Sequence, residues 1–390
     1  MAYFHIKIPY FLQKEINEVY IMHSLRSFAV STISIFIPIF LLQKGYSFFD
    51  LVIFFSLYAV SNIFFTLFGL LYASKKGVRH SISLSVPLLI MFFLSMYKID
   101  TLTLAIGEKV PLIIYPILYS ASMSFYFVGF HMEFARFSKE EKCAKQFGLV
   151  RAFSTAASVL GPFLGGVIIE VFSFNALFLV VVFFLFLSVA PLFCSRELHQ
   201  PFRFHLKDLF KHKKEAVPFL AEGFRFMAAK YFWPVLLFIL AIPLSSIGGV
   251  FTISSLLLAI FTVYMGKKTT DKNKHRILKI GAIGNSISLM ARSILKTFSA
   301  IAIVQGFGGL SWALVQLPYF SMFYNNSKKK GIAETIYMRE FYLNIGRLIS
   351  VIVVGMLLVF TAPGVAFTTL LILAGIVMLF MTRVADEKVN

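Results

Sequence analysis

Ionisable side chains inside long apolar segments are the residues of this 390-residue sequence that could do chemistry. Arg26 lies about 12 Å along a helix from Glu18, well inside the first apolar segment, and Lys230 lies comparably deep in a later one. Each would cost roughly 2.5–3.5 kcal/mol to insert into lipid. Such cations face water, a partner or a ligand. We interpret them as candidate binding groups for a small anion; the alternative for Arg26 is a structural pair with an acid on another helix.

The segment 335–361 holds the densest set of polar residues. Glu340 and Arg347 are seven residues apart and therefore on one helix face, with Asn344 between them. Because an unpaired ion there would be expensive, we predict that Glu340 and Arg347 form a coupling or gating pair. Arg339 is expected at the inner entrance.

Two further titratable residues, His131 and Glu133, lie near the end of one apolar segment. His131 could relay protons near physiological pH, although a structural histidine is the alternative. Glu133 is expected to pair with Arg79 or Arg151 at an inner gate, or to be a solvated carboxylate at a helix end.

Glu222 and Arg225 are three residues apart, which predicts a salt bridge on one helix face. As proton carriers we rank the candidates in the order Glu340, Glu133, Glu222 and His131. Arg292 and Lys296 are expected to be anchors at the outer membrane interface.

The elements that position these residues are apolar stretches of about 20 residues, the length that crosses a bilayer. The chain is 58% hydrophobic and only 14% charged, against about 25% charged in soluble domains. We therefore predict an all-α integral membrane protein with twelve transmembrane helices, near residues 19–43, 48–73, 79–98, 110–131, 147–171, 174–195, 218–243, 246–266, 277–298, 299–324, 335–361 and 364–382.

The basic residues are unevenly distributed between the loops. Of 37 Lys and Arg residues, 22 fall in alternate loops, which predicts that those loops and both termini are cytoplasmic. The net charge of +19 is therefore a topology signal with affinity for anionic lipid, and nucleic acid is not an expected partner. We expect a multi-pass protein of the cell membrane, and an amphipathic segment on the membrane surface over residues 1–17.

Polar residues recur at long period, in the same order in both parts of the chain. Glu18 and Arg26 are matched 204 residues later by Glu222 and Lys230, and Arg151 is matched 188 residues later by Arg339. This repeat predicts a six-helix half over 1–195, a cytoplasmic basic linker over 196–217 and a second six-helix half over 218–390. Rocking of one half against the other would give alternating access to a cavity between them.

Small residues recur every fourth position in the fifth predicted span. Such rows let helices approach closely, and close packing is a main source of helix association in lipid. Pro162 predicts a bend near Ser158. The residues that set the pattern are Gly148, Ala157, Gly161, Pro162, Gly165 and Gly166.

This pattern resembles the fifth-helix antiporter motif of the major facilitator superfamily, with Ala157 in place of its second glycine. Two basic turns resemble the loops that latch the cytoplasmic gate in that family. Ser74 replaces the aspartate of the first turn, and Lys274 stands where the second usually has glycine. The resemblance assigns gating to Lys75, Gly77, Arg79, Asp271, Lys272 and Arg276, together with Glu133, Arg151 and Arg339.

The resemblance and the charges together imply a secondary transporter of a small solute that works as a monomer in the bilayer. We expect proton-coupled efflux of an amphipathic molecule, driven by the proton gradient without a cofactor. The alternative is a carrier of an organic anion or organophosphate bound by Arg26 and Lys230. A membrane-embedded enzyme is disfavoured because the apolar segments hold no acid cluster for a metal and no apparent catalytic residues. A third possibility is a protein with a transporter fold that senses or scaffolds without moving a solute.

Overall fold

The computed structural model describes residues 14–138, 143–190, 216–295 and 297–383, all of which form helices or short connections. The predicted surface segment 1–17 and the linker 196–217 lie largely outside these residues. The helices are α1 (Lys14–Ile33), α2 (Ile37–Gln43), α3 (Phe48–Lys76), α4 (Val78–Tyr97), α5 (Ile99–Ile106), α6 (Val110–Phe137), α7 (Cys143–Ser158), α8 (Gly161–Val171), α9 (Phe174–Val189), α10 (Ala216–Met227), a π-helical turn η6 (Ala228–Phe232), α11 (Trp233–Ile239), α12 (Leu244–Lys268), α13 (Lys274–Arg292), α14 (Phe298–Lys330), α15 (Ile332–Phe360), α16 (Pro363–Met378) and a 3₁₀ turn η7 (Leu379–Arg383).

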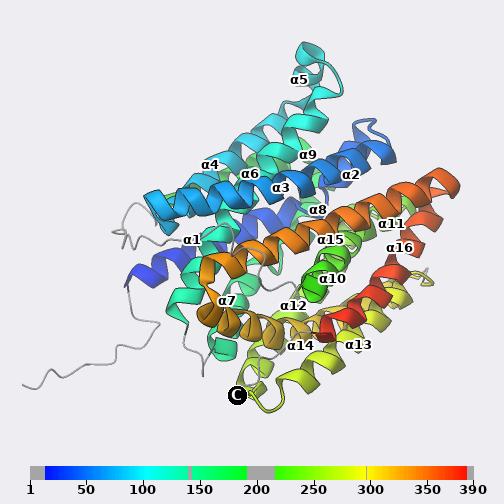
Figure 1. Ribbon diagram of the computed structural model, residues 1–390. Helices are drawn as coiled ribbons and strands as arrows, with labels where there is room; N and C mark the ends of the chain where they lie inside the picture. Colours follow the sequence, from blue (N-terminus) through cyan, green and yellow to red (C-terminus); the bar gives the residue numbers. More distant parts are fainter. Residues whose placement is uncertain (1–13, 139–142, 191–215, 296, 384–390) are drawn as a thin grey trace, which may run out of the picture.

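Within the described ranges, nine helical stretches are long and apolar enough to cross a membrane. Every span predicted from the sequence overlaps one helix or one helix broken into segments. The amphipathic α5 is a short extra helix at the periphery, at the top of Figure 1.

Three of the spanning helices depart from regular α-helix just before a proline, two by a break and one by a π-helical turn. The interruptions separate α1 from α2 ahead of Pro38, α7 from α8 ahead of Pro162, and α10 from α11 ahead of Pro234. Proline has no N–H to donate to the preceding turn and its ring clashes with that turn, which favours an interruption there. Pro87, Pro116 and Pro318 show that it does not require one, because α4, α6 and α14 continue through them. The break at residues 159–160 confirms the bend predicted near Ser158.

The helices form two groups that pack along one long contact (Figure 1). In the view, α3, α4 and α6 lie on the upper side, and α13, α14 and α16 lie on the lower side. The groups meet where α3 runs beside α15, and where α7 and α8 run beside α12. We call the group that contains α1 to α9 the first half and the group that contains α10 to α16 the second half. We call the end of the molecule at which α3, α12 and α14 finish in lysines (Lys75 and Lys76, Lys267 and Lys268, and Lys328 to Lys330) the basic end.

Glycines allow the closest helix contacts in the fold. A Cβ added to Gly161 or Gly165 would collide with Ser31 or with the Thr32 carbonyl of α1. The next row of the same helix faces the other half, because a Cβ on Gly166 would strike the Leu244 carbonyl of α12. The two small-residue rows of the fifth span therefore pack on two different helices, one in each half.

Candidate functional site

Three cations, of which Arg26 and Arg347 are buried and Lys230 is partly exposed, lie inside the molecule in three different elements. Arg26 lies in α1 and Lys230 in η6, and Arg347 stands about 22 Å along α15 from its start at Ile332, counted at 1.5 Å per residue. A hydrocarbon core is about 30 Å thick, so this depth lies well inside it. The charge of Lys230 interacts with those of both arginines. We call these three residues the central cationic layer.

Arg26 is held by an aromatic ring and a thioether rather than by an acid. Its Cζ lies 3.5 Å from the ring centroid of Tyr126, and its Nη2 lies 3.7 Å from the sulfur of Met123. His23, one turn away, hydrogen bonds through Nδ1 to the Tyr126 hydroxyl and stacks on Phe130. The histidine thus fixes the ring on which Arg26 lies.

Lys230 and Arg347 share an aromatic neighbour from the second half. The Phe226 ring centroid lies 5.1 Å from Lys230 Nζ and 4.5 Å from Arg347 Cζ. Arg347 Nη1 donates to Asn344 Oδ1 over 2.9 Å. Lys230 lies in the π-helical turn η6, which forms because Pro234 cannot donate to the carbonyl of Lys230 four residues earlier.

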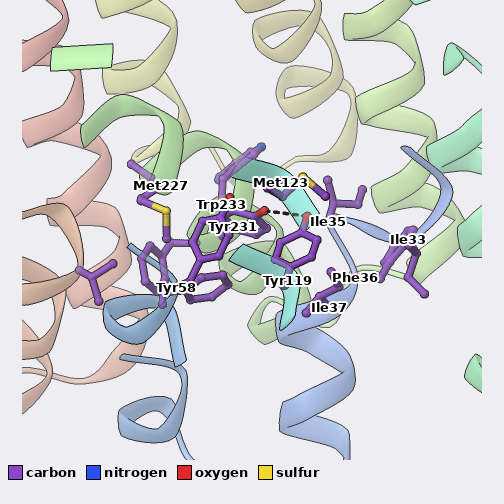
Figure 2. Close-up of a cluster of buried hydrophobic side chains, with 14 of the residues drawn as sticks. Ile33, Ile35, Phe36, Ile37, Tyr58, Tyr119, Met123, Met227, Tyr231 and Trp233 are labelled. Atoms are coloured by element: carbon purple, nitrogen blue, oxygen red, sulfur yellow. Dashed lines mark hydrogen bonds between the residues drawn. The ribbon is translucent and has the colours of Figure 1, made fainter. Parts of the chain in front are cut away.

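Tyrosines from both halves border this layer. Tyr119 of α6 and Tyr231 of η6 face each other in Figure 2, with their hydroxyl oxygens 3.4 Å apart. Tyr58 of α3 stacks on Tyr119, and its ring centroid lies 5.6 Å from Arg347 Cζ. The central layer therefore presents cations and aromatic faces together.

Among the described residues, no carboxylate forms an ion pair with Arg26, Lys230 or Arg347. Arg26 is only 3% exposed and Arg347 only 6%. A buried charge without an opposite charge is costly, because protein groups replace the lost hydration poorly. The layer is thus electrostatically incomplete.

A second charged group lies nearer the basic end, about 9–12 Å from the helix termini. Arg339 of α15 donates from Nη2 to Glu222 Oε1 of α10 over 2.7 Å, and from Nη1 to Glu340. Tyr319 of α14 donates to the other oxygen of Glu222 over 2.6 Å. We call Glu222, Arg339, Glu340 and His131 the inner charged cluster.

His131 brings the first half into this cluster. Its Nδ1 lies 2.6 Å from the hydroxyl of Tyr324, and its Nε2 lies 3.4 Å from Arg339 Nη1 and 4.0 Å from Glu340 Oε1. A second link between the halves runs from Arg151 Nη2 to Gln316 Oε1 over 3.3 Å. Charged groups therefore join α6 and α7 to α14 and α15.

Two pairings expected from the sequence are wrong. Glu340 pairs with Arg339 and not with Arg347. The Arg347 guanidinium instead donates a hydrogen bond to Asn344 on the same helix face. Glu222 likewise pairs with Arg339 of another helix, while Arg225 lies over the ring of Trp312 at 3.5 Å.

The gate-loop residues are placed at the basic end. Arg79 pairs with Glu133 over 3.4 Å, which joins α4 to α6 within the first half. Gly77 has φ +111°, a conformation that favours glycine, and it allows the sharp turn between α3 and α4. Asp271 pairs with Lys274 in an exposed position. The structure brings none of these described side chains to the central layer.

Arg292 was expected at the outer interface but is 5% exposed inside the second half, near Trp233. The arginine side chain fits there because Gly308 of α14 has no side chain that would collide with it. Sequence reasoning also missed the tyrosines at 58, 119, 231, 319 and 324. In a chain with 16 Tyr and 47 Phe, nothing in their spacing separates them from ordinary apolar packing.

Comparison with known proteins adds a family and a fold. A family model described as Major Facilitator Superfamily matches residues 19–213. No curated protein matches the chain in sequence. The structure is similar to that of the human organic anion transporter MFSD10 (TETRAN), with a TM-score of 0.68 and 11% identity over 94% of this chain and 99% of that one. It is also similar to the E. coli fucose:proton symporter FucP, with a TM-score of 0.66 and 11% identity over 95% and 98%.

These likenesses span nearly the whole chain and confirm the predicted architecture of twelve helices in two six-helix halves. At 11% identity they concern the fold alone.

Proposed function

The chain belongs to the major facilitator superfamily and is a secondary transporter of a small molecule, and we propose that its substrate is a small organic anion. The observation that carries this proposal is the central cationic layer, in which three cations from both halves, two of them buried, have no carboxylate partner among the described residues. An anion bound between Arg26, Lys230 and Arg347 would supply the missing charge.

The surroundings of the layer favour an anion with an aromatic or apolar part. The Tyr126 ring lies against the Arg26 guanidinium, and the Phe226 ring lies beside Lys230 and Arg347. Arginine binds phosphate and carboxylate through a planar set of donors, whereas lysine acts as a compact point charge. We therefore propose an aromatic carboxylate or phosphate as the substrate class.

We propose that protons drive transport through the inner charged cluster. Arg339 is shared by two carboxylates, and His131 attaches this group to the first half. Protonation of Glu340 would remove one charge from its ion pair with Arg339 and loosen the link between the halves. Proton uptake would in this way favour opening at the basic end, which we propose to be cytoplasmic.

The contacts between the halves fit alternating access. At the basic end Lys328 donates to the Ser138 carbonyl, and His131 bonds to Tyr324. Towards the opposite end Glu170 accepts from the Ser245 backbone N–H over 3.0 Å. The central layer thus lies between two sets of contacts, and breaking one set while keeping the other would expose it to one side. We also propose that residues 196–217 connect the halves as a cytoplasmic linker.

A second candidate is proton-coupled efflux of an amphipathic molecule without negative charge. The fifth-helix motif favours it, because the motif resembles that of antiporters and its glycines pack on both halves. The two candidates differ in the sign of the substrate charge, which transport can measure.

Proteoliposomes containing the full-length protein separate the candidates. We expect uptake or counterflow of an aromatic phosphate, and its loss in Arg26→Gln and Lys230→Gln, with a dependence on the pH gradient. Lys44→Gln is the control, because Lys44 pairs with Asp100 at the surface, far from the layer. Movement of a cationic dye but of no anion would overturn the anion proposal and favour the second candidate.

A further inference from the structure

The second half contains a buried arginine that the transport proposal does not use. Arg292 ends α13, is 5% exposed, and makes its one described hydrogen bond to the hydroxyl of Ser288, over 3.4 Å. The charge that acts on it comes from Arg225 and has the same sign. No described carboxylate pairs with either arginine.

Unpartnered polar atoms accompany this arginine. Arg292 Nε has no hydrogen-bond partner, and neither has the indole N–H of Trp233, a residue that is fully buried. The Trp233 ring centroid lies 5.7 Å from Arg292 Cζ. Both orphan groups are donors only, since neither guanidinium nor indole can accept. Two buried donors without acceptors call for an acceptor that the described chain does not supply.

The space around Arg292 is small. A Cβ on Gly308 of α14 would collide with Arg292 Nη2 and Ser288 Oγ, so the arginine fits because that position has no side chain. Nearby, Cβ atoms on Gly281 and Gly284 of α13 would approach α14 to 2.7 Å. Helices packed this closely exclude an organic substrate, so a ligand beside Arg292 would have to be a small ion.

We propose that a small monovalent anion of halide size binds between α11, α13 and α14, held by Arg292 and the Trp233 N–H. The anion supplies the acceptor and the negative charge that this part of the second half lacks. The Asn285 side chain, which donates to the Gly308 carbonyl over 3.1 Å, closes the site on the α13 side and keeps an unpartnered Oδ1 for a water carried with the ion.

This site is separate from the central cationic layer. Arg26, Lys230 and Arg347 come from α1, η6 and α15, whereas Arg292 comes from α13. The proposal therefore does not depend on the identity of the transported substrate. A halide could stay bound through the transport cycle as a structural ion.

The two tryptophans of the chain make the site measurable. Trp233 lies near Arg292, and Trp312 lies over Arg225. Trp312→Phe leaves Trp233 as the only fluorophore of its kind, and Trp233→Phe leaves Trp312. The experiment titrates bromide, a quenching halide, into the purified full-length protein in gluconate buffer at constant ionic strength.

We expect saturable quenching of Trp233 by bromide, relieved by chloride. Arg292→Gln should raise the half-saturating bromide concentration about tenfold or more, as expected for the loss of a charge-assisted hydrogen bond. Arg26→Gln should leave the quenching unchanged. Linear quenching that Arg292→Gln does not alter would overturn the proposal, as would saturable quenching that only Arg26→Gln removes.

A second measurement covers the case in which Arg292→Gln does not fold. Thermal unfolding of the otherwise unaltered protein is compared in chloride and in gluconate at equal ionic strength. Binding to the folded state alone predicts a higher midpoint in chloride, rising with its concentration. Equal midpoints would show that water fills the site and would overturn the proposal.

Discussion

Arg339 links the residues of the inner charged cluster to one another. It binds Glu222 and Glu340 and lies next to His131, so it joins two helices of the second half to one of the first. Removing one partner of a buried ion pair strands the other charge, at a cost of about 3–5 kcal/mol. A protonation event in this cluster is therefore able to shift the balance between two arrangements of the halves.

Glu340→Gln tests the coupling role of the cluster. The amide keeps the size of the side chain but takes up no proton, so we expect loss of pH-driven accumulation with counterflow exchange preserved. Both are measured in proteoliposomes with the same labelled anion. Glu334→Gln is the matched control, because Glu334 lies in the first turn of the same helix and outside the cluster.

Loss of both accumulation and exchange in correctly folded Glu340→Gln protein would contradict the coupling role. Glu340 would then serve the architecture of the cluster.

The sequence predicted the buried charges of Arg26, Glu340 and Arg347 but not that of Arg292. It predicted Arg79 as a partner of Glu133 but not the partners of Glu222 and Glu340. Spacing along one helix favoured Glu222 with Arg225 and Glu340 with Arg347, because neighbours on a helix face are all that one segment reveals. The actual partner of both acids, Arg339, was placed only at the entrance. Its guanidinium reaches Glu222 because α10 and α15 approach closely, at the glycines Gly223 and Gly346.

At the scale of the helices, apolar length predicted the spans, and Pro162 predicted one of the three interruptions. The interruptions ahead of Pro38 and Pro234 were not predicted, since Pro87, Pro116 and Pro318 lie inside helices that continue. The π-helical turn at Lys230 was not predictable, because proline dictates a lost hydrogen bond but not whether the helix bends, breaks or widens. Which row of small residues faces which neighbour also depends on the three-dimensional packing.

Alanine substitutions at the adjacent positions Gly248 and Gly249 of α12 test the close contact between the halves. A Cβ on Gly248 would collide with the Pro162 carbonyl of α8, whereas a Cβ on Gly249 would meet only Phe163, at 3.9 Å. We expect Gly248→Ala to destabilise the protein by about 1–3 kcal/mol through overpacking and to slow transport. Gly249→Ala should be neutral or stabilising by up to about 1 kcal/mol, because alanine favours helix.

Thermal unfolding in detergent and initial transport rates measure both variants. Equal behaviour of the two would show that the helices adjust freely and that the glycine contact does not fix their approach.

At the scale of the whole molecule, the account requires the halves to separate at the basic end during transport. Lys328 reaches the Ser138 carbonyl across the interface, so cysteines at these two positions can be joined by a short cleavable cross-linker in a background without Cys143 and Cys194. We expect cross-linking to stop transport and cleavage to restore it.

Cysteines at positions 44 and 100 provide the control. Lys44 and Asp100 form a surface ion pair 2.6 Å apart within the first half, so joining them should leave transport intact. Full transport with positions 138 and 328 joined would mean that this end does not open.

Binding of an aromatic phosphate to the purified full-length protein tests the central claim most directly, because it needs neither a gradient nor knowledge of transport direction. Calorimetric titration compares the unaltered chain with Arg26→Gln, Lys230→Gln and the Lys44→Gln control. We expect each central substitution to weaken binding about tenfold or more, because one charge-assisted hydrogen bond is lost, and the control to leave binding unchanged. Equal affinity in all four proteins would rule out an anion site at the central cationic layer.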